Sequence, residues 1–577
     1  MNLFSIVSAS AVGILSAVIL FDTVPFPSRF SSWWSTMHSF DFADLVVRNA
    51  TIFTSDSSLQ FAEAMAVRNG RILRLGSYSS VQDLISAKTL DVNLGRKVVV
   101  PGFIDSHVHF LNGGLQMGQL QLQNIRSQSE FVRSIKQAVE GKCKGCWILG
   151  GGWNNDFLGG SFPTSSWIDD ITPNNPVWLY RTDGHMGLAN HFSLKLAKIT
   201  NKTKDPIGGT VLRFSDGEPT GVLVDTAMKL VVSLIPEISI DERRHALVRA
   251  SKHALSRGVT TVVDFGRFLP GASTDLVWQD FLDVYKWANV TNEVFVRVSL
   301  FFPMQTWPSL VDLVKKNGKA LNENIYLGGV KTFADGSLGS RSALFYKTYV
   351  NEPDNYGLLV MDPVWLLNAT SASDRSGLQV AIHAIGDKAN DMILDLYDSI
   401  VSLNGLKDRR FRVEHAQHLS SETPPRFGKQ GVIASVQPQH LLDDADFVEK
   451  KIGAHRANTG SYLFQSILTG GGRLAFGSDW PVSDINPLEA IKTATTRIPP
   501  GWKSAWNTAE CMSLDDAIIA STISAAYANF LDNDLGSLST GKFADFVVLS
   551  ANSWEEFSKN PSQSILATYV SGVQAHP

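Results

Sequence analysis

The sequence predicts an α/β fold: a (β/α)8 TIM-like barrel with an inserted subdomain, plus a β-sandwich formed by the N- and C-terminal segments. Three observations support this prediction. Eight short apolar runs follow one another through the middle of the chain, each ending in polar or glycine residues. Helical periodicity fills the stretches between the later runs, as over Lys388 to Leu403. Both ends of the chain alternate apolar and polar residues, which is typical of strands with one buried face.

The eight apolar runs account for the barrel. In chain order they are VVVPGFIDSHVHF, VTTVVDFG, VFVRVSLFF, IYLGGVKTFADGS, LQVAIHAIGD, FRVEHAQ, VIASVQPQH and RLAFGSDWP. Eight buried strands alternating with helices is the number that closes such a barrel.

The distance between the first and second runs predicts the insertion. Residues from about Leu111 to Ile240 are too many for one crossover and include the glycine-rich segments GGGWNNDFLGG and RTDGHMGLAN. We expect a hydrophobic signal anchor or signal peptide at 1–24, a linker at 25–43 and the first part of the sandwich at 44–98. The barrel follows at 99–530, with its insertion at about 111–240, and the second part of the sandwich at 531–577.

The terminal segments account for the sandwich. LVVRNATIFT and AMAVRNGRILRLG read as short antiparallel strands, and the Asn-Gly pair in the second is a hairpin turn signal. GSLSTGKFADFVVLS and ATYVSGVQ repeat the pattern at the other end of the chain. We expect the two groups to pair, because chain termini often lie close together.

Composition excludes several classes of protein. The chain has 577 residues and a formal net charge of −4, so it offers no basic surface for nucleic acid. Three cysteines cannot form a disulfide framework. Cys143 and Cys146 form a lone CxxC, which could be half a zinc site, a redox pair, a small disulfide loop, or simply a turn with two thiols. The last interpretation is favoured, since Gly145 suits an exposed turn.

The N-terminus predicts a membrane segment. Leu3 to Phe21 is uncharged and about long enough to span a bilayer, and no A-x-A cleavage site ends it. A signal peptide and a buried helix are the alternatives to an uncleaved anchor. We expect a single-pass protein of the endoplasmic reticulum or another secretory-pathway membrane, with a luminal barrel. Four glycosylation sequons weakly favour the lumen and a glycoprotein: Asn49, Asn201, Asn289 and Asn368.

Polar residues at the ends of the apolar runs predict a metal site. His107 and His109 follow the first run, and alternate residues of a strand point to the same side. His383 and His415 end two later runs, and Asp479 ends the eighth. Each could alone be a satisfied buried histidine, or a helix cap in the case of Asp479. Together, at the barrel face where active sites form, they favour a site for zinc or a similar metal.

Lys331 ends the fourth run, in GGVKTFADGS. Burial lowers the pKa of a lysine, and the neutral amine can take up carbon dioxide to form a carbamate that bridges two cations. A lysine that extends to solvent at the barrel mouth is an equal alternative.

These motifs resemble those of the amidohydrolase superfamily, and specifically its YtcJ-like group. PGFIDSHVHF, GVKTFADGSLGSR, HAIGD, RVEHAQ, SVQPQH and FGSDWP stand in that group's order, and GSLSTGKFADFVVL is similar to its C-terminal signature. The resemblance covers the chain after about Asp44. With its N-terminal hydrophobic segment, the layout also resembles the plant Long-After-Far-Red type.

The resemblance implies roles for the site residues. His107 and His109 would bind one metal ion together with Asp479, His383 and His415 a second, and the carbamate of Lys331 would bridge them. The implied cofactors are two divalent metal ions, zinc being favoured, and carbon dioxide as lysine carbamate. The implied function is hydrolysis of C–N bonds other than peptide bonds, in N-acyl or N-formyl amides, by a hydroxide held between the metals. Asp479 would carry the proton. The alternative is a membrane-anchored signalling or scaffold protein with little or no catalysis.

Further residues are candidates for substrate contact. They are His185, Trp153, His440, Asp335 and Arg341. Hydrogen bonding within loops is an equal alternative for the two histidines, and a simple turn for the segment at Asp335. The expected partners are a small amide-type substrate and a membrane, with no nucleic acid, and edge strands could support a homodimer.

Overall fold

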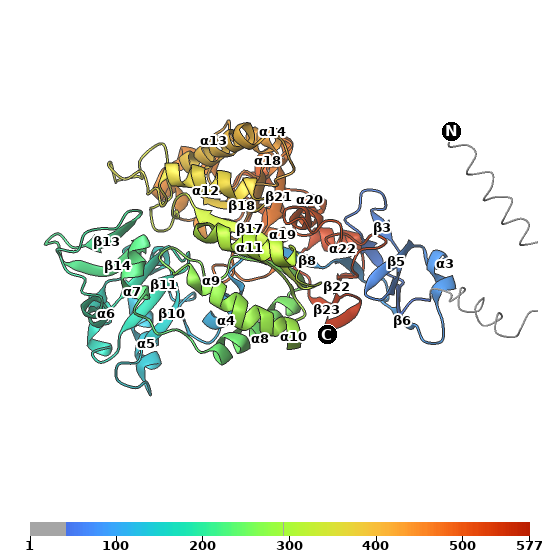
Figure 1. Ribbon diagram of the computed structural model, residues 1–577, viewed down its shortest axis with the longest axis horizontal. Coiled ribbons are helices and arrows are strands. Elements are labelled where there is room, and N and C mark those ends of the chain that lie inside the picture. The colour runs from blue at the N-terminus through green and yellow to red at the C-terminus, as the bar shows by residue number, and fades with distance from the viewer. Residues whose placement is uncertain (1–41, 292) are drawn as a thin grey trace, which may run out of the picture.

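A computed structural model of the chain, which describes residues 42–291 and 293–577, confirms the predicted fold class (Figure 1). Its centre is a parallel sheet of eight strands in the order β21-β20-β19-β18-β17-β16-β15-β8. Each of the eight predicted runs contributes one of them. Their bounds are β8 Phe103–Val108, β15 Val259–Asp264, β16 Arg297–Pro303, β17 Ile325–Phe333, β18 Gln379–Ala384, β19 Arg412–His415, β20 Ile433–Val436 and β21 Arg473–Phe476.

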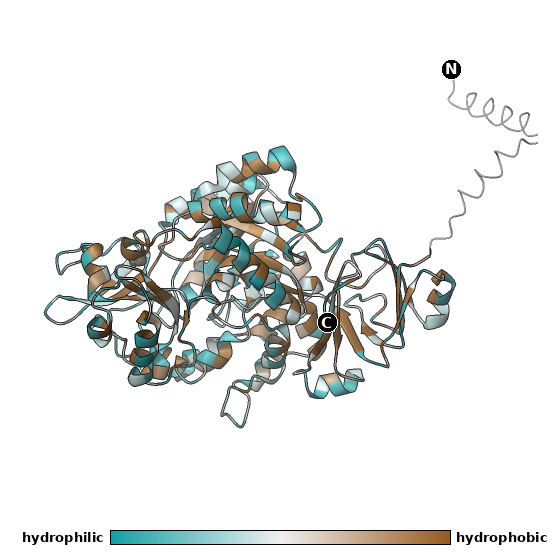
Figure 2. Cartoon of the chain, turned by 90° about the horizontal axis from the view of Figure 1, so that it is seen from below, coloured by the Kyte–Doolittle hydropathy of each residue, from teal (hydrophilic) through white to brown (hydrophobic). Residues whose placement is uncertain are grey.

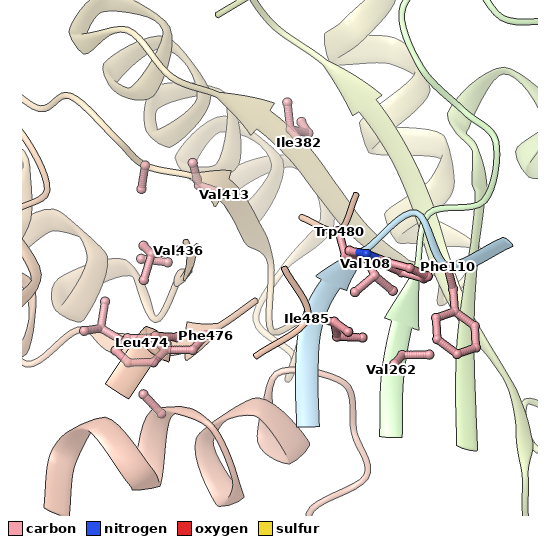
Figure 3. Packing of buried hydrophobic residues seen from close by; sticks show 14 of the residues in the cluster. Val108, Phe110, Val262, Ile382, Val413, Val436, Leu474, Phe476, Trp480 and Ile485 are labelled. Carbon is pink, nitrogen blue, oxygen red and sulfur yellow. The ribbon is translucent and has the colours of Figure 1, made fainter. Parts of the chain in front are cut away.

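The first and last strands of this order meet and close the barrel. Val108 at the end of β8 forms a parallel bridge with Trp480, just beyond β21. The backbone N–H of Asp479 donates to the His107 carbonyl at 2.7 Å, and that of His109 to the Trp480 carbonyl at 2.8 Å. Figure 3 shows Trp480 beside Val108. The closure therefore lies at three of the predicted metal ligands.

Helices between the strands cover the barrel. The main ones are α8 Ile240–Ser256, α11 Trp307–Asn317, α12 Pro363–Arg375, α13 Asp387–Asn404, α14 Pro424–Gln430 and α19 Pro487–Thr496. The helix predicted over Lys388 to Leu403 is α13. It buries Ile393, Tyr397 and Ile400, which lie on one face because they are three and four residues apart. Strand residues such as Val262 and Ile382 are fully buried beneath the helices (Figure 3).

The first predicted run forms two strands rather than one. Val98–Pro101 is β7, which pairs outside the barrel with β2 (Thr51–Phe53) and β22 (Phe546–Leu549). Only Phe103–Val108 enters the barrel. Gly102 separates them, and a Cβ atom there would lie 2.3 Å from Thr260 Oγ1. The close approach of the β15 strand therefore requires glycine at this crossing point.

Segments from both ends of the chain form the sandwich. One sheet has the order β5-β4-β1-β6 and the other β24-β23-β22-β7-β2-β3. Val47 and Met65 of the first pack with Val99, Phe546 and Tyr569 of the second in one buried cluster. The apolar strands of this unit are brown in Figure 2. The remaining bounds are β1 Leu45–Arg48, β2 Thr51–Phe53, β3 Phe61–Ala62, β4 Ala64–Arg68, β5 Arg71–Gly76, β6 Leu90–Asn93, β22 Phe546–Leu549, β23 Ile565–Val570 and β24 Val573–His576.

The insertion is built on its own sheet, in the order β13-β14-β12-β11-β10-β9, at the end of the molecule opposite the sandwich (Figure 1). Cys143 and Cys146 form a disulfide in the loop before β10, so the CxxC is a small disulfide loop and not the turn with free thiols that we favoured. The bounds are β9 Leu120–Gln121, α5 Gln128–Val139, β10 Ile148–Trp153, β11 Val177–Arg181, β12 Met186–Ala189, α6 His191–Leu196, β13 Gly209–Arg213, β14 Pro219–Asp225 and α7 Lys229–Val232.

The predicted membrane localisation is corrected. Among the described residues, no helix is long and apolar enough to cross a bilayer. The longest described helix, α13, has 18 residues but carries five charged side chains, which are costly inside a membrane. This finding contradicts the expected single-pass protein of a secretory-pathway membrane. The stretch Leu3 to Phe21, on which that expectation was based, lies outside the described residues.

Candidate metal centre

Three predicted ligands meet where the barrel closes. Asp479 Oδ1 lies 3.4 Å from His107 Nε2 and 3.6 Å from His109 Nε2. All three side chains are buried, and within the described structure Asp479 Oδ1 has no hydrogen-bond partner. Both distances are too long for a good hydrogen bond. Ligand atoms ~2.1 Å from one tetrahedral metal ion lie about 3.4 Å apart. The buried, unpartnered oxygen facing two imidazole nitrogens therefore fits a cation ligand.

Two further histidines extend the cluster across the barrel. His383 is the penultimate residue of β18 and His415 is the last residue of β19. Their ring centroids are 4.4 Å apart, and the His415 ring lies 4.9 Å from that of His107. His415 and Asp479 both have left-handed backbones, with φ of 77° and 57°. Such conformations are uncommon outside glycine, and strain of this kind is concentrated at functional sites. The barrel therefore brings the four predicted imidazoles together.

Lys331 points into the same interior from β17. It is buried, and its Nζ lies 4.4 Å from the ring centre of Phe265 and 5.2 Å from that of Phe333. Burial lowers the pKa of Lys331 to about 8, although the carboxylates of Glu414 and Asp479 oppose the shift. Roughly a tenth of this amine is therefore neutral at pH 7 and able to act as a nucleophile. The alternative of a lysine extending to solvent does not match its burial.

Each of three imidazoles has a partner that orients its ring. The Nδ1 atoms of His107, His109 and His415 lie 2.7 Å from Glu414 Oε2, the Gly266 carbonyl and Gln437 Oε1, respectively. An imidazole with Nδ1–H bound to an acceptor presents Nε2 as a free lone pair, which is the usual arrangement behind a metal ligand. These partners direct the Nε2 atoms towards the centre.

Glu414 and Arg412 are functional residues that the sequence reasoning missed. Both are fully buried on β19, and Arg412 Nε binds Glu414 Oε1 at 2.7 Å. Arg412 also donates to the Ser106 carbonyl and to Asn529, which holds the pair beneath β8. The segment RVEH could have indicated this pair from the sequence. Two charged residues in a buried strand must be compensated by each other or by a nearby charged site, because an unpaired buried charge is costly.

The protonation states suit metal binding. Burial lowers the pKa of His107, His383 and His415 well below the ordinary value, and that of His109 to about 4. These imidazoles are neutral at pH 7, as metal ligands must be. Burial raises the pKa of Asp479 to about 7, and the Lys331 ammonium opposes that rise. A carboxyl group with this pKa can both accept and release a proton near neutral pH.

A cavity of about 60 Å³ opens over the centre and brings in two of the predicted substrate contacts. His185 Nδ1 lies 2.6 Å from Asp225 Oδ1, and its ring is 4.9 Å from that of His383. Burial lowers the pKa of His185, but the carboxylates of Asp225, Asp183 and Asp335 together outweigh burial and raise the pKa above its ordinary value. His440 Nε2 is buried without a partner in the described structure, and its ring stacks 6.3 Å from that of His415. Asp225 had not been recognised from the sequence.

The other predicted contacts lie elsewhere. Trp153 is fully buried in the core of the insertion, and its indole N–H donates to the Leu179 carbonyl at 2.8 Å. Arg341 pairs with Glu352 and is about one-third exposed. Neither lines the cavity over the centre.

Asp335 lies behind His383 rather than in the cavity. Its carboxylate accepts the backbone N–H groups of Leu344, Ile385 and Gly386, at 2.8 to 3.0 Å. These bonds tie the loop after β17 to the end of β18, so Asp335 is placed to hold the backbone that carries His383.

Comparison with known proteins agrees with this geometry. The amidohydrolase family profile matches residues 92–576. The chain is 58% identical over 573 residues to Protein LONG AFTER FAR-RED 3 of Arabidopsis thaliana, covering 98% of each chain. It is 30% identical to YtcJ of Bacillus subtilis (strain 168), named provisionally as an amidohydrolase, covering 87% of this chain and 92% of YtcJ.

A solved structure shows the same architecture. An uncharacterized metal-dependent hydrolase from Pyrococcus furiosus superimposes with a TM-score of 0.67 and 26% identity, covering 88% of this chain and 99% of that one. A barrel with histidines and an aspartate at its strand ends, matched along most of its length by these relatives, shows that the chain belongs to the amidohydrolase family, whose fold it shares with a metal-dependent hydrolase.

Proposed function

We propose that the protein hydrolyses non-peptide C–N bonds, in N-acyl or N-formyl amides, at a centre of two divalent metal ions, with zinc favoured. The observation that carries the proposal is the buried, unpartnered Asp479 Oδ1 facing the Nε2 atoms of His107 and His109. In this proposal those three residues hold one ion, and His383 and His415 hold the other. Bound divalent ions would polarise a substrate carbonyl and lower the pKa of water towards neutrality.

Lys331 would join the two halves of the centre as a carbamate. Its neutral amine would add to carbon dioxide, forming an N–C bond and releasing one proton to solvent. The product is a bidentate anion, which satisfies the charge of two cations in a buried site better than an ammonium group could.

Asp479 would act as the general base and then the general acid of the reaction. With a pKa near 7 its carboxylate would accept a proton from water at the oxygen that does not bind metal and deliver it to the leaving nitrogen, so that the amine departs neutral. His185, held by Asp225, and His440, whose Nε2 has no partner among the described residues, would orient the substrate carbonyl.

The test is metal content together with amide hydrolysis in the full chain. We expect near two equivalents of zinc per chain by mass spectrometry in bicarbonate buffer, and fewer in Lys331→Ala than in a matched Lys316→Ala control on the surface of α11. Release of amine from simple N-acyl and N-formyl amides should accompany the metal. A folded protein that binds no zinc would refute the proposal.

A second candidate function follows from the name of one relative. Protein LONG AFTER FAR-RED 3 is named for far-red light and not for a reaction. Full zinc content without hydrolysis of any amide tested would favour a signalling or scaffold role on the same barrel.

A further inference from the structure

A second cavity adjoins the metal centre, between the inserted sheet and the barrel. Its volume is about 150 Å³, and His109 lines one end of it together with Pro481 and Val482. It shares Arg181, Thr182 and Val482 with the cavity over His383 and His415. A molecule whose reacting bond lies at the metal centre could therefore extend directly into this second cavity.

The walls of this cavity are largely apolar. Aliphatic side chains that are only half-buried line it from the insertion and from the barrel: Leu149, Val232, Ile235, Leu269 and Leu276. The rings of Trp178 and Tyr180, which contact each other edge to face at 5.6 Å, also line it. Water against such walls is released favourably when an apolar group replaces it.

The charged residues of the cavity are already paired. Arg267 Nε lies 2.7 Å from Asp280 Oδ2, and its Nη1 lies 2.8 Å from Glu237 Oε1. Asp280 also binds Arg243 at 2.6 Å. Because the guanidinium of Arg267 is neutralised on two sides, it is not available to bind an anionic ligand. The charged groups of the lining therefore neutralise one another, and the larger part of the cavity surface that a ligand can contact is apolar.

We propose that this cavity binds an apolar substituent of the substrate, up to about the size of a phenyl or pentyl group, while the scissile bond lies at the metal centre. An engineered apolar protein cavity of about 150 Å³ binds benzene, which sets this size. The inference rests on the proposed function and names its substrate class: amides with a bulky apolar group on one side. Since Leu149, Trp178 and Tyr180 belong to the insertion, the insertion selects the substrate.

The first test measures binding separately from turnover. Methyl ethyl ketone, methyl pentyl ketone and benzylacetone are probes in which CH2 replaces the amide N–H, so they cannot be hydrolysed. Isothermal titration of the zinc-loaded full chain should show affinity rising roughly fourfold per added methylene, with benzylacetone binding at least as tightly as methyl pentyl ketone. Equal affinity across the three ketones would overturn the proposal.

The second test fills the cavity. Ala272 lines it, so Ala272→Phe should weaken benzylacetone binding at least tenfold and leave methyl ethyl ketone unchanged. Ala87→Phe, at an exposed turn in the sandwich, is the matched control. If Ala272→Phe does not fold, Ala272→Leu obstructs the cavity with a smaller side chain. The ketone series on the unaltered chain also tests the proposal without any substitution. Unchanged benzylacetone binding in a folded Ala272→Phe protein would count against the cavity.

The matching amides separate this inference from the proposed function. N-methyl-, N-butyl- and N-benzylacetamide should be hydrolysed with kcat/KM rising in the same order as ketone affinity. A graded ketone series without hydrolysis of any amide would retain the apolar subsite and refute the hydrolase. Hydrolysis at equal kcat/KM, together with equal ketone affinities, would retain the hydrolase and refute the subsite.

Discussion

The barrel and the insertion both contribute groups to the site, but they position them differently. In the barrel, His107 is held by Glu414, which lies 307 residues away in sequence, and every candidate ligand stands at the end of a buried strand. In the insertion, His185 is held by Asp225, only 40 residues away and within the same local sheet. In the proposed function, the barrel would hold the metal ions with residues that long-range strand pairing brings together, and the insertion would provide surfaces that contact the substrate.

The strongest test of the barrel side is Asp479→Asn. An amide oxygen can still face His107 and His109, but the side chain no longer carries a proton. We expect zinc content to be retained and kcat to fall by about 10²–10⁴-fold. Steady-state kinetics with metal analysis on the same sample checks this. Full activity in a zinc-loaded Asp479→Asn protein would remove Asp479 from the proton-transfer role.

The corresponding test of the insertion is His185→Gln. Losing the imidazole held by Asp225 should lower kcat/KM by about 10²-fold, because a polar contact to the substrate carbonyl is lost. Zinc content should not change, since His185 is not among the proposed ligands. His191→Gln, at an exposed position of the insertion, is the control. Loss of zinc in His185→Gln would instead make His185 a ligand and weaken the comparison.

Glu414→Gln tests whether the Glu414 carboxylate, which contacts the candidate ligand His107, contributes to metal affinity. The amide keeps the shape of the side chain but loses the charge that orients His107 and neutralises Arg412. We expect zinc affinity, measured by competition with a chelator, to fall about 10–100-fold. Glu323→Gln on the surface should leave it unchanged. If both variants bind zinc equally tightly, the carboxylate does not support the metal centre.

Trp153→Phe should have the smallest effect. Phenylalanine keeps most of the buried ring but cannot donate to the Leu179 carbonyl, at a cost of about 1 kcal/mol in unfolding free energy. Because Trp153 lies in the core of the insertion, kcat and KM should stay within about twofold of the unaltered chain while thermal stability falls slightly. A large rise in KM would instead show that Trp153 contributes to substrate binding, as predicted from the sequence.

The sequence predicted the barrel well because its signals are local. Each buried parallel strand is a short apolar run, and a polar residue at its end lies at the barrel mouth by topology alone. His107, His109, Lys331, His383 and Asp479 could therefore be named without knowing any distance between them. The substrate contacts were less predictable. Trp153 and Arg341 lie in segments whose polar and glycine residues gave no information about which way a side chain points.

By itself the sequence determined the order of elements, the strands that carry the candidate ligands and the pairing of the chain ends in one sandwich. Only the tertiary structure decided that Val98–Pro101 leaves the barrel, that Glu414 supports His107, and that an apolar cavity lies beside His109. The physical reason is the distance along the sequence over which each feature is determined. Hydrophobic periodicity is set by neighbours within one element, whereas a buried ion pair or a cavity wall depends on residues that are brought together only when the barrel closes and the insertion packs against it.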